Sequence, residues 1–108
     1  TQKYFLANDA NNLIAMANTW IAMDISNNSL YKGNFEAALN GIKCPAIVMP
    51  ADSDLYFRVA DNEYEVSHMP KASLRTIPSK WGHGAGFGMD DLDNNLVDQA
   101  ILDILNAC

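Results

Sequence analysis

Residues 44–57 read CPAIVMPADSDLYF, and this stretch decides the fold class. Residues 46–49 form a short apolar run without alternation, which predicts a strand buried on both faces of a parallel sheet. Pro50 and the acidic residues Asp52 and Asp54 end that run. The sequence therefore predicts a buried strand that leads directly into a polar loop.

The segments that follow alternate between helix and strand signals. A helical segment over 59–68 is closed by Pro70, and residues 72–78, ASLRTIP, form a second strand candidate. A last helix is predicted over 90–108. A strand, helix, strand and helix in this order predict a parallel sheet, so the fold class is α/β.

The last predicted helix has an apolar face and an acidic start. Asp90, Asp91 and Asp93 lie in its first turn, where the helix dipole favours negative charge. We expect its apolar face to consist of Leu92, Leu96, Val97, Ala100, Ile101 and Ile104.

The N-terminal part of the chain is predicted to be helical. Leu13, Met16, Trp20 and Met23 recur at three- and four-residue steps within residues 8–26, which is typical of one face of a helix. Asn8 or Asp9 is the expected N-cap. After turn-forming residues at 26–33, a short helix is expected over 35–42.

Two strands alone do not make a stable parallel sheet, because both faces need cover and each strand leaves an unpaired edge. The sequence therefore predicts the C-terminal part of a larger α/β domain. Residues 1–43 would form a helical connecting region, and residues 44–108 would belong to the core of that domain.

The composition excludes several classes of partner. The chain has 7 basic and 13 acidic residues, so its net charge is −6 and it has no basic surface for nucleic acid. No stretch of the chain has the roughly 18 to 20 apolar residues that a membrane span needs. We expect a cytoplasmic protein that binds neither nucleic acid nor membrane.

Residues 80–88, KWGHGAGFG, place four of the six glycines around His83. A phosphate cradle is disfavoured because the spacing does not fit G-x-G-x-x-G and no G-K-S/T follows. A metal site is disfavoured because His83 has no second histidine or cysteine at ligand spacing, and His68 lies across a predicted strand. We expect no metal, and we expect His68 to be an exposed residue that complements a helix C-terminus.

A catalytic base fits this stretch better. In open α/β sheets, reactive groups lie at the carboxyl ends of the strands. Asp52 and Asp54 follow the first strand and His83 follows the second, so they should lie on neighbouring loops of one rim. A carboxylate that accepts the imidazole Nδ1–H fixes the tautomer of a general base. The alternative is an acidic loop beside a glycine-rich turn with a packed histidine.

Three blocks of the sequence resemble the homoserine O-acetyltransferase-like branch of the α/β-hydrolase superfamily. They are FLANDANNLIAMANTWIAMDIS at 5–26, IKCPAIVMPADSDLYF at 42–57 and SLRTIPSKWGHGAG at 73–86. They occur in the family's order, and the first is the most discriminating. The resemblance implies the C-terminal portion of that fold, with residues 1–43 in its helical lid region.

The resemblance also implies site residues and substrates. The acid of a Ser-His-Asp triad falls on Asp54 and the base on His83, whereas Asp52 has no matching role. The family's acyl donor is acetyl-CoA, used as a substrate with no bound cofactor, and the family allows a homodimer. The small-molecule acceptor would be a hydroxyl compound in a transferase and water in an esterase.

The nucleophile is the one large departure from the family pattern. Ser26, Ser29, Ser53, Ser67, Ser73 and Ser79 all lack the G-x-S-x-G setting. We therefore expect the serine to come from an N-terminal remainder of the fold and the isolated chain to be inactive. The competing hypothesis is a non-catalytic truncated relative that acts as a binding domain.

Overall fold

Two short parallel strands form the sheet in the computed structural model of the chain, which describes residue 3 and residues 6–107. Strand β1 (Ala46–Val48) pairs with β2 (Ala72–Leu74), with Ala46 opposite Ala72 and Val48 opposite Leu74. Both strands lie inside the predicted runs but are shorter. The parallel pairing together with the helices around it confirms the α/β fold class.

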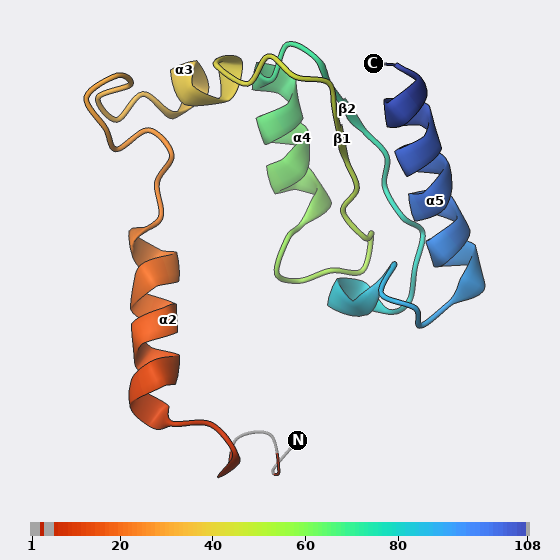
Figure 1. The fold of residues 1–108 in the computed structure, drawn as a ribbon, viewed down its shortest axis with the longest axis horizontal. Helices are drawn as coiled ribbons and strands as arrows, with labels where there is room; N and C mark the ends of the chain where they lie inside the picture. Colours follow the sequence, from red (N-terminus) through yellow and green to blue (C-terminus); the bar gives the residue numbers. More distant parts are fainter. Residues whose placement is uncertain (1–2, 4–5, 108) are drawn as a thin grey trace. The chain divides into compact units, whose positions relative to one another are not determined.

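Two helices cover this sheet from opposite sides, as Figure 1 shows. Helix α4 (Val59–His68) connects the strands and packs on β2, whereas α5 (Asp91–Asn106) follows the second strand and packs on β1. The α4 bounds equal the predicted ones. The predicted end of the last helix at residue 108 lies outside the described residues.

Backbone pairing continues beyond the strands and brings their following loops together. Ala51 and Ile77 form a parallel bridge, with the Ile77 N–H donating to Pro50 and the Asp52 N–H donating to Ile77 at 3.0 Å. Ala51 and Ile77 are both buried. Because the two segments stay paired up to Ala51 and Ile77, the loops that follow them start at the same end of the sheet.

Only part of the predicted apolar face of helix α5 is covered within the described chain. Asp93 and Ala100 are buried and Val97 and Ile104 are partly buried, whereas Leu92, Leu96 and Ile101 are exposed. These last three residues therefore have no cover within the described chain, and their packing in a larger domain stays a prediction. A polar contact accompanies this arrangement, because the buried Asp93 accepts a hydrogen bond from the buried Ser79 hydroxyl.

The chain divides into two compact units, Thr1–Phe35 and Glu36–Cys108. Helix α2 (Ala10–Ala22) of the first unit begins at Asp9, whose carboxylate accepts the Asn11 N–H at 2.7 Å. No residue of α2 is buried, and Trp20 is 59% exposed. Trp20 therefore does not form part of a core within the described chain. Helix α3 (Phe35–Asn40) starts at the last residue of the first unit and continues into the second, and its buried residues are Ala38 and Leu39.

The core is small. Among the described residues, the fully buried apolar ones are Ala38, Leu39, Ala51, Ile77 and Ala100. The β1 residues are only half-buried, and β2 is the only partner strand of β1 in the described chain, so burial on both faces stays a prediction for a larger domain. None of the helices in the described part of the chain is long and apolar enough to cross a membrane.

Candidate active site

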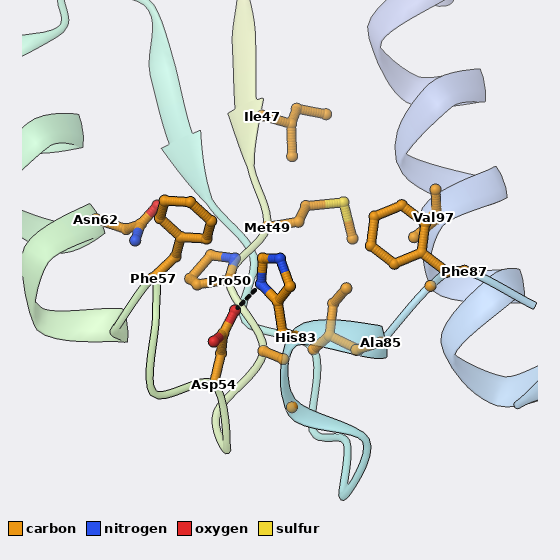
Figure 2. A pocket seen from close by; sticks show the side chains of 14 residues that line it. Ile47, Met49, Pro50, Asp54, Phe57, Asn62, His83, Ala85, Phe87 and Val97 are labelled. Atoms are coloured by element: carbon orange, nitrogen blue, oxygen red, sulfur yellow. Dashed lines mark hydrogen bonds and ion pairs between the residues drawn. The ribbon is translucent and has the colours of Figure 1, made fainter. Parts of the chain in front are cut away.

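Asp54 and His83 meet at the end of the paired strands. The Asp54 loop follows β1 and the His83 loop follows β2, and Asp54 Oδ2 lies 3.1 Å from His83 Nδ1. Figure 2 shows this contact as a dashed line between the two side chains. The geometry thus joins the two residues that the sequence singled out as acid and base.

The Asp54 carboxylate is buried and held by hydrogen bonds. Its side chain is 7% exposed, and its Oδ1 accepts the Tyr56 N–H at 2.7 Å. Desolvation raises the pKa of Asp54, but the hydrogen bonds from Tyr56, His83 and Phe57 outweigh it, so this pKa lies below its ordinary value. Asp54 is therefore an anion at neutral pH.

An anionic Asp54 determines the proton position on His83. A carboxylate only accepts hydrogen bonds, so the Nδ1 of His83 carries the proton in this contact. In a neutral imidazole with this tautomer, the second ring nitrogen, Nε2, is an acceptor. The His83 side chain is 54% exposed, so one side of the ring is open. A half-exposed imidazole whose Nδ1 is held by a carboxylate is an arrangement that suits a general base.

Two aromatic rings flank the imidazole. The ring centroid of Tyr56 lies 5.1 Å from that of His83, and the centroid of Phe57 lies 5.4 Å away. Both aromatic residues follow Asp54 within three positions. The segment that supplies the carboxylate therefore also supports the imidazole ring.

A pocket of about 480 Å³ opens beside His83. Figure 2 shows Met49, Phe57, Phe87 and Val97 around the two polar side chains. The full lining is Ile47, Met49, Pro50, Ala51, Asp54, Phe57, Asn62, Ile77, Gly82, His83, Ala85, Gly86, Phe87 and Val97. Trp81 is not in this lining and is 40% exposed, so it does not shape this pocket.

The glycines around His83 allow a tight loop. Residues Gly82–Gly84 form one turn of 3₁₀ helix, with Gly82 at φ +53°. Gly86 has φ +76°, and a Cβ on it would lie 3.0 Å from Val97 Cγ2. Both backbones are in the left-handed region that favours glycine. The glycine-rich stretch thus shapes the backbone that presents His83.

Sequence reasoning missed the polar contacts that join the two loops. Asp52, to which the family resemblance gives no role, accepts the Ser79 N–H on its Oδ1 at 3.1 Å. Ser53, Ser79 and Asp93 also take part in side-chain hydrogen bonds between these segments. Their sequence positions could have pointed to them, because Ser53 directly precedes Asp54 and Ser79 lies four residues before His83.

His68 lies elsewhere and has partners. It occupies the last turn of α4, and its Nε2 is 3.5 Å from Glu36 Oε1. Its ring lies beside that of Tyr64, with centroids 4.6 Å apart and the planes tilted by 48°. Its side chain is 28% exposed, so the expectation of a simply exposed residue was wrong. Within the described residues, no group of three or more histidine, cysteine or acidic side chains could hold a metal ion.

Comparisons with known proteins point to enzymes that transfer or hydrolyse acetyl groups. The chain is 32% identical over 106 residues to an ethyl acetate hydrolase of Pseudomonas veronii, a match that covers 98% of this chain and 30% of that enzyme. It is 35% identical over 79 residues to a homoserine O-acetyltransferase of Cyclobacterium marinum, covering 70% of this chain and 22% of the enzyme. A homoserine O-acetyltransferase of Salinibacter ruber is 27% identical over 89 residues, with 82% and 24% covered.

These relatives are of the α/β-hydrolase type, in agreement with the fold class of the chain. The chain spans less than a third of the length of each. No protein-family profile matches the chain, and no solved structure matches it.

Proposed function

We propose that the chain is the C-terminal part of a homoserine O-acetyltransferase-like enzyme that transfers an acetyl group from acetyl-CoA to a hydroxyl acceptor. The observation that most supports this proposal is the 3.1 Å contact between a buried Asp54 carboxylate and His83 Nδ1, with the rest of the ring open. The similarity to two homoserine O-acetyltransferases supports the reaction class.

In the proposed first step, a serine from the N-terminal remainder of the protein attacks the acetyl carbonyl. His83 Nε2 accepts the serine proton, and the anionic Asp54 stabilises the resulting imidazolium through Nδ1–H. The thiolate of CoA then leaves and takes the proton from Nε2. The products of this half-reaction are an acetyl-serine and free CoA.

In the second step, His83 Nε2 accepts the proton of the acceptor hydroxyl as its oxygen attacks the acetyl-serine. The serine oxygen leaves and regains the proton from the imidazolium, so the enzyme returns to its starting state. Asp54 keeps its charge throughout. No bound cofactor or metal enters either step.

Hydrolysis is the second candidate function. The match to an ethyl acetate hydrolase extends over 98% of the chain, which specifically favours it. The residues would act identically, with water in place of the acceptor alcohol. The acceptor pocket therefore decides between the two activities, and it includes segments outside this chain.

Large apolar side chains on the surface support a partial domain. Leu92, Leu102 and Leu105 on α5 are 74%, 54% and 67% exposed. Exposed apolar area of this extent is typical of surfaces that pack against further structure. This feature favours an N-terminal remainder that covers the core and supplies the nucleophile.

The test uses the protein expressed from its complete coding sequence. We expect saturable release of CoA from acetyl-CoA that requires homoserine or another alcohol, and loss of this release in His83→Ala. Turnover of ethyl acetate or 4-nitrophenyl acetate without an alcohol identifies the hydrolase instead. Absence of every acyl-transfer activity in a folded protein would support a binding domain. Residues 1–108 alone are expected to be inactive in each assay.

A further inference from the structure

Two serine hydroxyls connect the Asp54 loop with the backbone that precedes His83. The Ser53 Oγ accepts the Gly82 N–H at 3.0 Å and donates to the Ser79 carbonyl oxygen. The Ser79 Oγ accepts the Trp81 N–H at 3.1 Å and donates to Asp93 Oδ2. Each hydroxyl therefore receives one main-chain N–H from the two residues before the histidine.

The acceptors of these hydroxyls belong to firmly packed parts of the unit. Ser79 and Asp93 are 6% and 4% exposed, and Asp93 lies in the first turn of α5. The Ser79 N–H donates in turn to Asp52 Oδ1. The segment before His83 is thus connected to α5 on one side and to the Asp54 loop on the other.

The local backbone explains why these contacts bear on the histidine. Gly82 has φ +53° and precedes His83 directly. A Cβ on Gly82 would lie 3.4 Å from the Ser53 carbonyl oxygen, so the two loops approach closely at this residue. A shift of the Gly82 peptide would change the direction in which the following imidazole points.

We propose that Ser53 and Ser79, with Asp93 as the acceptor of Ser79, are positioning residues that hold the His83 ring against Asp54. This inference rests on the proposed function for its catalytic meaning. Replacing either serine by alanine removes the acceptor of one main-chain N–H and the hydroxyl that links it to a neighbouring segment. The histidine loop then relaxes, and a misplacement of about 1 Å lowers a reaction rate by about 10²-fold.

Kinetics of the complete protein test this role with matched variants. Ser53 is exposed, so Ser53→Ala leaves the core intact and Ser53→Thr keeps the hydroxyl. We expect about a 10- to 100-fold lower kcat with unchanged KM in Ser53→Ala, and recovery in Ser53→Thr. Ser67→Ala is the control, because the Ser67 hydroxyl donates to Tyr64 within α4. A kcat within twofold of the parent in Ser53→Ala would overturn the proposal.

The buried Ser79–Asp93 hydrogen bond is tested with two variants. Asp93→Asn keeps an acceptor oxygen, and Asp93→Ala does not. We expect a lower kcat for the alanine variant than for the asparagine variant, at equal KM. Equal and undiminished kcat values in the two variants would remove Asp93 from the assignment. If Asp93→Ala does not fold, the comparison of Ser53→Ala with Ser53→Thr decides the proposal alone.

Hydrogen exchange separates this inference from the proposed function. In Ser53→Ala we expect faster exchange at the amides of Trp81 and Gly82, and unchanged exchange in α4. If the complete protein shows this exchange pattern but has no acyl-transfer activity, the serine hydroxyls hold the His83 loop but have no role in catalysis. Unchanged exchange at both amides would reject the connection itself.

Discussion

The Nδ1 atom of His83 lies 3.1 Å from Oδ2 of Asp54, although 29 positions separate the two residues in the sequence. Parallel pairing of β1 with β2, extended by the Ala51–Ile77 bridge, brings their loops to one rim. Asp54 is buried and His83 is about half-exposed, so the carboxylate is shielded from solvent while the imidazole is open to it. This asymmetry is the basis of the predictions below.

Replacing Asp54 by asparagine should leave the fold intact and remove most of the activity of the complete protein. The amide can donate to Nδ1 and so favour the tautomer with the proton on Nε2. In a serine-protease triad this change lowers kcat by about 10⁴-fold, and we expect a loss of about 10³- to 10⁴-fold here. Asp98→Asn on the exposed side of α5 is the control and should retain the parental kcat.

Acid should weaken the stabilising contribution of Asp54. Its pKa lies below the ordinary value, because the hydrogen bonds from Tyr56, His83 and Phe57 outweigh desolvation. When the pKa of a carboxyl is lower in the folded than in the unfolded state, its ionised form stabilises the fold. For Asp54 this contribution is complete above the unfolded-state pKa, about 4, and it is lost as the pH falls through the folded-state pKa. Unfolding midpoints of the parent and Asp54→Asn should therefore converge below about pH 4. A constant difference from pH 7 to pH 3 would contradict this expectation.

Gly86→Ala should destabilise the protein more than Gly88→Ala. Both glycines have positive φ, +76° and +86°, so each alanine costs about 1–2 kcal/mol of conformational energy. Only at Gly86 would the new Cβ meet a neighbour, the Val97 side chain at 3.0 Å, whereas nothing lies within 4 Å at Gly88. Thermal unfolding of the two variants measures the difference, and equal midpoints would show that the Val97 contact is unimportant.

The start of α5 should depend on its N-cap. Asp90 Oδ1 accepts the Leu92 N–H at 2.9 Å, so Asp90→Ala should lower the free energy of unfolding by about 1 kcal/mol. Asp90→Asn keeps the acceptor and should retain most of that stability. Urea unfolding of the two variants measures the effect. An asparagine variant as unstable as the alanine variant would assign the effect to charge rather than to capping.

The order of elements was predictable because it depends on local patterns. The apolar run before Pro50, the helix over 59–68 and the polar residues after each strand predicted an α/β unit with Asp54 near His83. Parallel strands place their carboxyl ends together, so loop neighbourhood follows from element order alone.

The hydroxyl contacts and the burial of Asp93 could not be predicted from those patterns. Hydrophobic periodicity predicted the apolar face of α5 but gave no sign that Asp93 would be buried and hydrogen-bonded to Ser79. A serine or aspartate has the same sequence appearance in a solvated loop and in a buried hydrogen bond. The contact of His68 with Glu36 could not be predicted for the same reason, because it joins two helices that are separate in the sequence.

A double-mutant cycle on kcat/KM of the complete protein, with Asp54→Asn, His83→Ala and both together, tests most directly whether the two residues act as one unit. The account predicts large losses in both single variants and a double variant no slower than His83→Ala, since an acid without its base has nothing to orient. Losses that multiply in the double variant, or a His83→Ala protein with parental activity, would contradict it.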